Sequence, residues 1–254
     1  MKNSVVLITG ASSGIGLACA HAFAQAGAKL ILAARRGDRL ESLQAELTAQ
    51  WGTAVYCLCL DVRDRAAVEQ SLSDLPADWA AIEVLVNNAG LSRGLDPFQT
   101  ASLEDWEEMI DTNIKGLLYV TRFLLPGMIA RGRGHVINIG SIAGYQTYPR
   151  GNVYCATKAA VRTLSEALKL DLLGTSLRVT NVDPGMVETE FSQVRFHGDQ
   201  ERAQAVYQGL KPLTPEDVAD VVLFCASRPP HVNINEVVLM PTDQASATLV
   251  HRQR

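Results

Sequence analysis

Short, almost entirely apolar runs alternate with longer amphipathic stretches along the whole chain, and this alternation limits the possible folds more than any other feature. Each run has the length of a strand, and a run without polar alternation suits a strand that is covered on both faces. Parallel sheets have such strands, so the pattern predicts one α/β domain over 1–254 with a doubly wound, parallel, seven-stranded sheet. The apolar runs lie at 4–9, 29–34, 54–60, 82–86, 135–139, 177–182 and 236–240.

The stretches between these runs predict helices, and several of them begin with a capping residue. Asp38, Ser102 and Thr214 each precede a helix-like pattern, and each has a side chain that can accept a hydrogen bond from a free N–H of the first turn. The connection 184–213 is longer and less regular than the others, which is typical of a functional lid. The predicted helices lie near 14–26, 38–50, 64–74, 102–130, 153–173 and 215–227.

Three glycines stand directly between the first strand and the first helix, in the segment ITGASSGIG (8–16). Glycine at Gly10, Gly14 and Gly16 lets the backbone turn tightly and approach a ligand closely. The following helix N-terminus offers free N–H groups and a positive dipole end to a phosphate. In this position the triplet predicts a dinucleotide site on a single-domain Rossmann fold, with a tight turn that binds nothing as the alternative.

Tyr154 and Lys158 stand four residues apart in an otherwise apolar helical pattern, GNVYCATKAAV (151–161). This spacing puts the phenol and the ammonium on one face of the helix. They could simply form the solvent-exposed polar face of an amphipathic helix. Alternatively, the positive charge lowers the pKa of the phenol from its usual value near ~10 and prepares it for proton transfer.

Taken together, these segments resemble the short-chain dehydrogenase/reductase family over nearly the whole chain. The segment 9–16 matches the cofactor loop of the family, NNAG (87–90) matches its motif after the fourth strand, and DPGMVET (183–189) resembles its Pro-Gly segment. Each motif is short, but their order and their places on the predicted elements make the set specific. The residues that match the catalytic tetrad of the family are Asn113, Ser141, Tyr154 and Lys158.

The resemblance implies a role for each member of this tetrad in an oxidoreductase. Tyr154 would be the acid/base, and Lys158 would activate it and hold the nicotinamide ribose. Ser141 would hydrogen-bond the carbonyl oxygen of the substrate, and Asn113 would help to hold a water that links Lys158 to solvent. Considered alone, Ser141 and Asn113 could equally be polar residues of a turn and of a helix interior.

The sequence AARRGDRL (33–40) after the second predicted strand indicates the form of the cofactor. An enzyme that uses NAD usually has an acidic residue there, whereas this chain has Arg35 and Arg36. Guanidinium groups match a phosphate with forked, charge-assisted bonds, so NADP(H) is predicted, with a solvated surface pair as the alternative. The predicted cofactor-binding residues are Thr9, Gly10, Ser12, Ser13, Gly14, Ile15, Gly16, Arg35, Arg36, Asp61, Val62, Asn88, Ala89, Gly90, Tyr154, Lys158, Pro184, Gly185, Val187 and Thr189.

Within the family, the chain most resembles the bacterial NADP-dependent 3-hydroxy acid dehydrogenases, a branch that acts on serine and allo-threonine. Segments such as GNVYCATKA (151–159) and FSQVRFHGD (191–199) carry the likeness. A near relative of this branch is NADPH-dependent sulfoacetaldehyde reductase, which makes isethionate. The resemblance therefore implies a small anionic carbonyl or hydroxy compound as the substrate.

A buried anion needs a fixed positive partner, and Arg195 is the first candidate, unless it lies on a mobile surface loop. Arg150 would add a second positive charge, which favours a sulfonate over a carboxylate. We therefore predict an NADPH-dependent reductase of a small anionic aldehyde or ketone, with sulfoacetaldehyde as the leading substrate and 3-hydroxy acid oxidation as the alternative. The predicted substrate-binding residues are Ser141, Gln146, Tyr148, Arg150, Tyr154 and Arg195.

Composition excludes several other classes of function. The net charge is −4 without a long basic run, so nucleic acid is not an expected partner. No window approaches the ~18 apolar residues of a membrane span. The cysteines and histidines show no metal-ligand spacing, and an odd, scattered set of five cysteines indicates reduced thiols and a cytoplasmic location.

Two rival functions remain open from the sequence. A regulator that binds NADP(H) without catalysis is disfavoured by the intact tetrad. A reductase for bulky apolar substrates is disfavoured by the many charged residues of 184–213.

The helices at 102–130 and 153–173 are apolar on more than one face, which together with the resemblance predicts a homotetramer. The C-terminal segment 243–254 is a candidate to reach a neighbouring subunit.

Overall fold

The computed structural model describes residues 1–253 and contains one parallel sheet in which seven strands follow the order β3-β2-β1-β4-β5-β6-β7. The strand order reverses between β1 and β4, which both pair in parallel with their neighbours. This confirms the predicted doubly wound sheet. The strands are β1 (Val5–Thr9), β2 (Lys29–Ala34), β3 (Val55–Cys59), β4 (Ile82–Asn87), β5 (His135–Ile139), β6 (Arg178–Pro184) and β7 (Glu236–Leu239).

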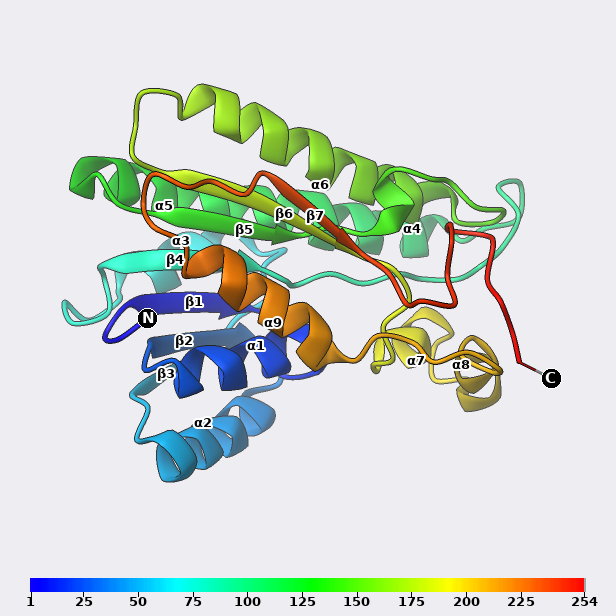
Figure 1. The fold of residues 1–254 in the computed structure, drawn as a ribbon, viewed down its shortest axis with the longest axis horizontal. Coiled ribbons are helices and arrows are strands. Elements are labelled where there is room, and N and C mark those ends of the chain that lie inside the picture. The colour runs from blue at the N-terminus through cyan, green and yellow to red at the C-terminus, as the bar shows by residue number, and fades with distance from the viewer. Residues whose placement is uncertain (254) are drawn as a thin grey trace.

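Helices cover both faces of the sheet, which explains why most residues of β1 to β6 are buried and many of them are apolar (Figure 1). Successive side chains of a strand point to opposite faces. Val6 and Ile8 of β1 accordingly pack into one core layer, and Val5 and Leu7 pack into the other. The first layer is closed by α1 (Gly14–Gln25), α2 (Gly37–Trp51) and α9 (Pro215–Ala226), and the second by α3 (Arg65–Ser73), α5 (Leu117–Arg131) and α6 (Asn152–Asp171).

The long helix predicted at 102–130 is interrupted by a wider π-helical turn at Asp111–Gly116, between α4 (Leu103–Ile110) and α5. Such turns are rare and occur often at functional sites. This one contains the predicted tetrad residue Asn113, whose side chain is turned inward and buried. The interruption therefore falls at a position that the sequence analysis had already selected.

Two of the three predicted helix starts are confirmed. The Ser102 hydroxyl accepts a hydrogen bond from the N–H of Asp105 at 3.1 Å, and Thr214 forms a reciprocal capping box with Asp217. The prediction for Asp38 was wrong. Helix α2 begins at Gly37, so Asp38 lies inside the first turn, where its charge favours the helix dipole instead of capping a free N–H.

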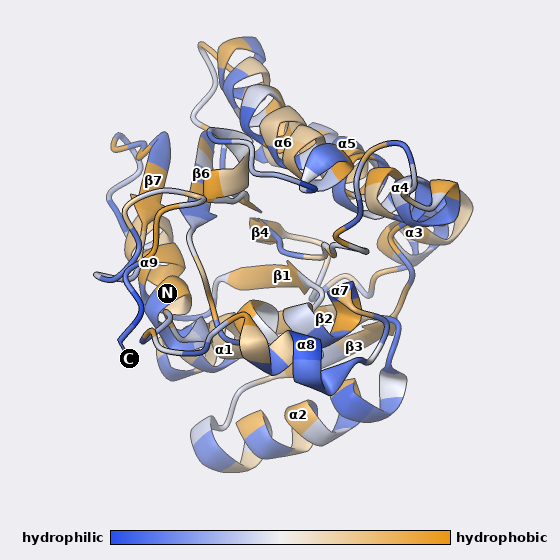
Figure 2. Cartoon of the chain, turned by 90° about the vertical axis from the view of Figure 1, so that its right-hand side faces the viewer, coloured by the Kyte–Doolittle hydropathy of each residue, from blue (hydrophilic) through white to orange (hydrophobic). Residues whose placement is uncertain are grey.

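The connection 184–213 forms a compact unit with two short helices, α7 (Phe191–Arg195) and α8 (Gln200–Ala205). A parallel bridge between Val187 and Leu213 joins its two ends. The unit lies beyond the carboxyl ends of the strands, on the right of Figure 1 and towards the viewer in Figure 2. It is therefore in place to cover a site at this edge of the sheet, as predicted for a lid.

The C-terminal segment lies against this unit and not away from the chain. The N–H of Gln253 donates to the carbonyl of Gly209 at 2.6 Å, and the N–H of Ala247 donates to the side-chain oxygen of Gln146 at 2.9 Å. These bonds lie within one chain, and a contact of this segment with a neighbouring subunit stays a prediction. Within residues 1–253 no helix has the length and apolar character needed to cross a membrane.

Candidate active site

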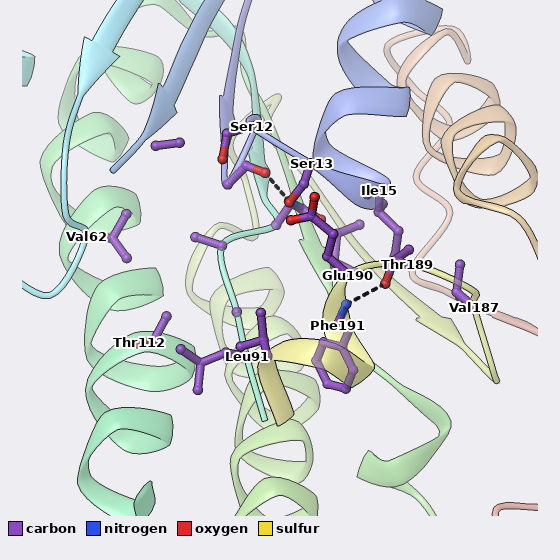
Figure 3. Close-up of a pocket in the computed structure, with 18 of the residues that line it drawn as sticks. Ser12, Ser13, Ile15, Val62, Leu91, Thr112, Val187, Thr189, Glu190 and Phe191 are labelled. Atoms are coloured by element: carbon purple, nitrogen blue, oxygen red, sulfur yellow. Dashed lines mark hydrogen bonds between the residues drawn. The ribbon is translucent and has the colours of Figure 1, made fainter. Parts of the chain in front are cut away.

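A cavity of ≈ 340 Å³ opens at the carboxyl ends of the strands, between the glycine loop and the start of the 184–213 segment (Figure 3). It lies where the strand order reverses, which is the usual ligand site of an open α/β sheet. Most of the predicted cofactor and catalytic residues line it. They are Gly10, Ser12, Ser13, Gly14, Ile15, Arg35, Arg36, Asp61, Val62, Asn88, Ala89, Gly90, Ser141, Tyr154, Lys158, Pro184, Gly185, Val187 and Thr189.

Two of the predicted cofactor residues, Thr9 and Gly16, lie behind the cavity wall and shape it. The Thr9 hydroxyl accepts hydrogen bonds from the N–H groups of Asn88 and Ala89, each at 3.0 Å. A methyl group on Gly16 would lie 2.4 Å from the carbonyl oxygen of Gly10. Gly16 therefore lets helix α1 approach the loop closely, and the loop itself remains open to a ligand.

At one end of the cavity, the Arg36 guanidinium lies across the glycine loop. Its Nη2 donates to Ser12 Oγ at 3.0 Å and to Ser13 Oγ at 2.8 Å. One guanidinium beside two hydroxyls is a suitable donor set for a phosphate. Arg35 is more exposed, and its Nη1 lies 3.9 Å from Glu108 at the same end of the cavity.

Two charged residues at this end of the cavity, Glu190 and Arg39, were not predicted from the sequence. Glu190 accepts a hydrogen bond from Arg36 Nη1 at 2.9 Å and another from Arg39 Nη1 at 2.7 Å. Partial burial acts to raise the pKa of Glu190, but the bonds from Arg39 and Arg36 outweigh it and hold the pKa below its usual value. No spacing in the sequence connects Glu190 with arginines that lie about 150 positions earlier.

At the other end, α6 presents Tyr154 and Lys158 to the cavity from one helix face, and both side chains are buried. Lys158 Nζ donates to the carbonyl oxygen of Ile139 at 2.8 Å. Burial lowers the pKa of Lys158 to about 8, and the negative charge of Asp183 acts in the opposite direction. The ammonium is thus anchored to the end of β5.

The pKa of Tyr154 differs from the sequence-based expectation. Burial raises it above the usual value for a phenol, while Arg195 and a hydrogen bond with Ser141 act to lower it. The cation that opposes the effect of burial is Arg195, whereas the spacing predicted Lys158. The difference arises because Lys158 points at a backbone carbonyl and Arg195 lies over the phenol ring.

Asn113 belongs to the wall that supports the cavity. Its Oδ1 accepts from the N–H of Leu91 at 2.9 Å, and its Nδ2 donates to the Leu91 carbonyl at 2.8 Å and to Thr157 Oγ1 at 3.0 Å. These bonds connect the strand end after β4 to helix α6. Asn113 therefore fixes Leu91, which lines the cavity, beside the helix that carries Tyr154.

Ser141 is held by a buried carboxylate that the sequence analysis did not single out. Its backbone N–H donates to Asp183 Oδ1 at 2.8 Å. The same carboxylate accepts from Asn181 Nδ2 at 2.5 Å and from the Tyr145 hydroxyl at 3.3 Å. Burial raises the pKa of Asp183 to about 6, against the effect of these donors. Asp183 thereby fixes the loop that presents the Ser141 hydroxyl beside Tyr154.

Arg195, at the end of α7, packs against Tyr154, which lines the cavity, although Arg195 is not itself a lining residue. Its guanidinium carbon lies 5.2 Å from the centre of the Tyr154 ring and 5.4 Å from that of Phe191. Its Nε donates to Ser92 Oγ at 2.9 Å, and its Nη2 donates to the Tyr148 hydroxyl at 2.5 Å. A fixed cation next to the phenol is what a small anionic substrate requires.

The structure does not bring two of the predicted substrate residues to this point. Gln146 is exposed, and its side-chain oxygen accepts a bond from the C-terminal segment. Arg150 is exposed in the turn before α6, where its backbone is left-handed with φ 67°. Arg150 does not line the cavity, although it is only four residues from Tyr154.

Helix α7 is fastened over the cavity by the strand end after β4. Arg93 Nη1 donates to the carbonyl of Val194 at 2.6 Å, and the N–H of Gly94 donates to the carbonyl of Arg195 at 2.9 Å. Arg93 Nε is itself bound to Glu108 at 2.6 Å. The helix that carries Arg195 is therefore fixed at its C-terminal end by these bonds and at its N-terminal end by Glu190.

Comparisons with known proteins agree with this geometry. The chain is 53% identical over 251 residues to the NADP-dependent 3-hydroxy acid dehydrogenase YdfG of Escherichia coli O6:H1, covering 98% of this chain and 100% of that protein. It is 48% identical over 252 residues to sulfoacetaldehyde reductase 2 of Chromohalobacter salexigens, covering 98% and 99%.

A similar solved structure is the closed form of a serine dehydrogenase complexed with NADP⁺, with a TM-score of 0.93 and 52% identity. The match covers 98% of this chain and 100% of that one. The model of the short chain dehydrogenase family matches residues 4–200. With this match, the parallel sheet and the relatives above, the chain belongs to the short-chain dehydrogenase family.

Proposed function

We propose that the protein catalyses the NADP-dependent oxidation of a small 3-hydroxy acid and the reverse reduction. The observation that carries this proposal is the position of Arg195 over the Tyr154 ring, at one end of a cavity whose other end holds Arg36 and the glycine loop. The names of the relatives at 53% identity and of the structural neighbour support the same substrate class.

Each residue around Tyr154 has its own role in the proposed reaction. NADP(H), when bound, supplies or accepts the hydride. Tyr154 takes the proton of the substrate hydroxyl during oxidation and returns it during reduction. Ser141 hydrogen-bonds the same oxygen, and the charge of Arg195 acts to lower the pKa of the Tyr154 phenol. Lys158, fixed on the Ile139 carbonyl, holds the nicotinamide ribose. Arg195 holds the carboxylate, which fixes the reacting carbon beside the phenol.

The end of the cavity at Arg36 and the glycine loop, called here the adenosine end, fits the adenosine part of NADP(H) better than that of NAD(H). The donors on the glycine loop side are the Arg36 guanidinium and the hydroxyls of Ser12 and Ser13, all suited to a 2′-phosphate. The strand β2 ends in Ala34 and is followed by Arg35, where NAD enzymes usually have an acid. A phosphate there gains charge-assisted bonds that a ribose hydroxyl cannot match.

A carboxylate is the preferred anion. The preference for a sulfonate, and with it for sulfoacetaldehyde, depended on a second positive charge from Arg150, which lies outside the cavity. Arg195 Nε and Nη2 already donate to Ser92 and Tyr148, so few donors remain for the third oxygen of a sulfonate. The relative named for sulfoacetaldehyde is less similar, at 48% identity. The 3-hydroxy acid reaction therefore replaces it as our leading proposal.

The test is a substrate panel with NADP⁺ and NAD⁺ as alternative oxidants. Serine, allo-threonine and 3-hydroxypropionate carry a carboxylate, isethionate carries a sulfonate, and 1-propanol carries no charge. We expect kcat/KM to be highest for a 3-hydroxy carboxylate with NADP⁺. Faster turnover of isethionate would overturn the substrate class, and equal turnover with NAD⁺ would overturn the cofactor.

We also propose that the protein is a homotetramer located in the cytoplasm. Apolar side chains are exposed on the outer faces of α5 and α6, and such surface in one region favours association. They include Leu118 at 40% and Ile129 at 45% exposure in α5 and Leu170 at 68% in α6, and Leu173, in the turn after α6, is 83% exposed. Light scattering at micromolar concentration tests the assembly, and a monomeric mass would contradict it. The free thiols of the five cysteines fit a reducing compartment.

A further inference from the structure

Glu190 joins the substrate segment to the arginines at the adenosine end. It directly precedes α7, and its carboxylate accepts from Arg36 Nη1 at 2.9 Å and from Arg39 Nη1 at 2.7 Å. Figure 3 shows this carboxylate turned towards the glycine loop, next to Ser13. Glu190 also lines the cavity, so it lies within reach of a ligand there.

The carboxylate of Glu190 lies where a phosphate would have to compete with it. Arg36 donates to the hydroxyls of Ser12 and Ser13 with Nε and Nη2 and to Glu190 with Nη1. A phosphate on these hydroxyls would carry about 1.5–2 negative charges. Glu190 would then both repel the phosphate and hold one of the donors that the phosphate needs.

We propose that Glu190 is a selectivity residue of the cofactor site, which the 2′-phosphate must displace from Arg36 and Arg39 in order to bind. Its displacement frees the start of the substrate segment from the glycine loop and from α2. This proposal rests on the NADP(H) part of the proposed function. The proposal adds a carboxylate to a phosphate site otherwise made of arginines and hydroxyls.

Displacement of Glu190 acts on the substrate end of the cavity through α7. Glu190 is followed by α7, which ends in Arg195, and the N–H of Phe191 donates to Thr189 Oγ1 at 3.1 Å at the base of this helix. The far end of α7 stays fastened through Val194. Phosphate binding therefore changes how one end of α7 is held while the other end keeps its place, which couples the two ends of the cavity.

The alternative role for Glu190 is a support that orients Arg36 for the phosphate. The two roles predict opposite effects of the isosteric change Glu190→Gln. Loss of a competitor tightens phosphate binding, whereas loss of a support weakens it. Glu188→Gln is the matched control, because it removes the same charge two residues away from an exposed side chain.

The first experiment uses calorimetric titration with 2′,5′-ADP and with 5′-AMP, which differ only in the 2′-phosphate and do not reach the catalytic residues. We expect Glu190→Gln to bind 2′,5′-ADP roughly 10- to 150-fold more tightly than the wild type, the range of one charged hydrogen bond. Binding of 5′-AMP should not change, and Glu188→Gln should behave as the wild type. Equal or weaker binding of 2′,5′-ADP by Glu190→Gln overturns the proposal.

A second measurement tests the release of α7 separately. Hydrogen exchange of 189–195 should become faster when wild type binds 2′,5′-ADP, and should already be fast, and insensitive to 2′,5′-ADP, in Glu190→Gln. Unchanged exchange in the wild type overturns the coupling. If neither the wild type nor Glu190→Gln prefers 2′,5′-ADP over 5′-AMP, the NADP(H) assignment fails as well. If both prefer it equally, only the role of Glu190 fails.

Discussion

The guanidinium carbon of Arg195 lies 5.2 Å from the ring centre of Tyr154, so the cation proposed to hold the substrate and the phenol proposed to move its proton are direct neighbours. Arg195 reaches this position on α7, in the segment that follows β6. Its charge also acts to lower the pKa of the phenol. In the proposed reaction, one side chain would thus serve both substrate binding and proton transfer.

Arg195→Ala should therefore damage the reaction of anionic substrates far more than that of neutral ones. A desolvated anion without its partner costs about 2–5 kcal/mol, or roughly 30- to 5000-fold in kcat/KM. Arg195→Lys should recover only part of the loss, because an ammonium does not offer the forked geometry. The measurement is kcat/KM for the best 3-hydroxy acid and for 1-propanol.

Arg150→Ala is the control for this prediction, because Arg150 lies near Tyr154 in sequence but is exposed outside the cavity. It should leave kcat/KM within about twofold, as surface charges far from a site have little effect. A similar fall for anionic and neutral substrates in Arg195→Ala would identify Arg195 as a structural support of α7 instead.

The two arginines after β2 should contribute unequally to NADPH binding. Arg36 is bound to the hydroxyls of the glycine loop, whereas Arg35 is 54% exposed and lies near Glu108. Arg36→Ala should weaken NADPH binding by about 1.5–3 kcal/mol, roughly 10- to 150-fold, and leave NADH nearly unchanged. Arg35→Ala should cost less than about fivefold. Fluorescence titration with both cofactors gives the values, and a larger loss for Arg35→Ala would reverse this assignment.

The fold could be predicted from the sequence because its signals are local. Each of the buried strands is an apolar run, and the glycines of the loop stand between the first strand and the first helix. The neighbourhood of Tyr154 and Lys158 also follows from local geometry, since a spacing of four fixes one helix face. The resemblance then indicated which of these residues to place in the site.

The remaining features depend on contacts between distant segments, which no local pattern encodes. Glu190 meets Arg36 across 154 positions, and Asp183 meets Ser141 across 42. The direction of an exposed side chain is equally hidden, as Arg150 shows. Its place in the sequence suggested the active site, but its side chain is exposed and does not line the cavity.

Gly16→Ala should disturb the glycine loop although Gly16 does not line the cavity. The added methyl would lie 2.4 Å from the Gly10 carbonyl oxygen and 2.5 Å from Asn88 Nδ2, and Asn88 is itself fixed by bonds to Thr9 and Gly10. We expect a loss of about 1–3 kcal/mol in the free energy of unfolding and at least tenfold weaker NADPH binding.

Gly37→Ala provides the matched control for Gly16→Ala. Its methyl would lie 3.6 Å from Cys59 Sγ, an ordinary contact, at the first position of α2. This variant should unfold at the same denaturant concentration as the wild type or gain up to about 1 kcal/mol. Wild-type stability and NADPH affinity in Gly16→Ala would show that the loop can shift without cost.

His135 should make the protein less stable in acid. It opens β5, where it is buried, with Nε2 2.8 Å from Thr180 Oγ1 and with no hydrogen-bond partner for Nδ1 among residues 1–253. Burial lowers its pKa from 6.5 to about 3, with a smaller effect from the charges of Arg178 and Lys169. The folded state therefore keeps this imidazole neutral at pH values where the unfolded state already protonates it.

The sign of the pH effect follows from this difference. Above pH 6.5 both states hold a neutral His135, so its contribution to stability is complete. As the pH falls below 6.5, only the unfolded state takes up the proton, and stability is lost progressively down to about pH 3. At pH 5 the loss is about 2 kcal/mol, from roughly 1.5 units at 1.36 kcal/mol each.

Urea unfolding at pH 7.5 and 5.0 should show a pH-dependent loss that is smaller by this amount in His135→Gln. The exposed His231, changed to Gln, should behave as the wild type. An equal loss in His135→Gln and the wild type would mean that His135 titrates normally in the folded state.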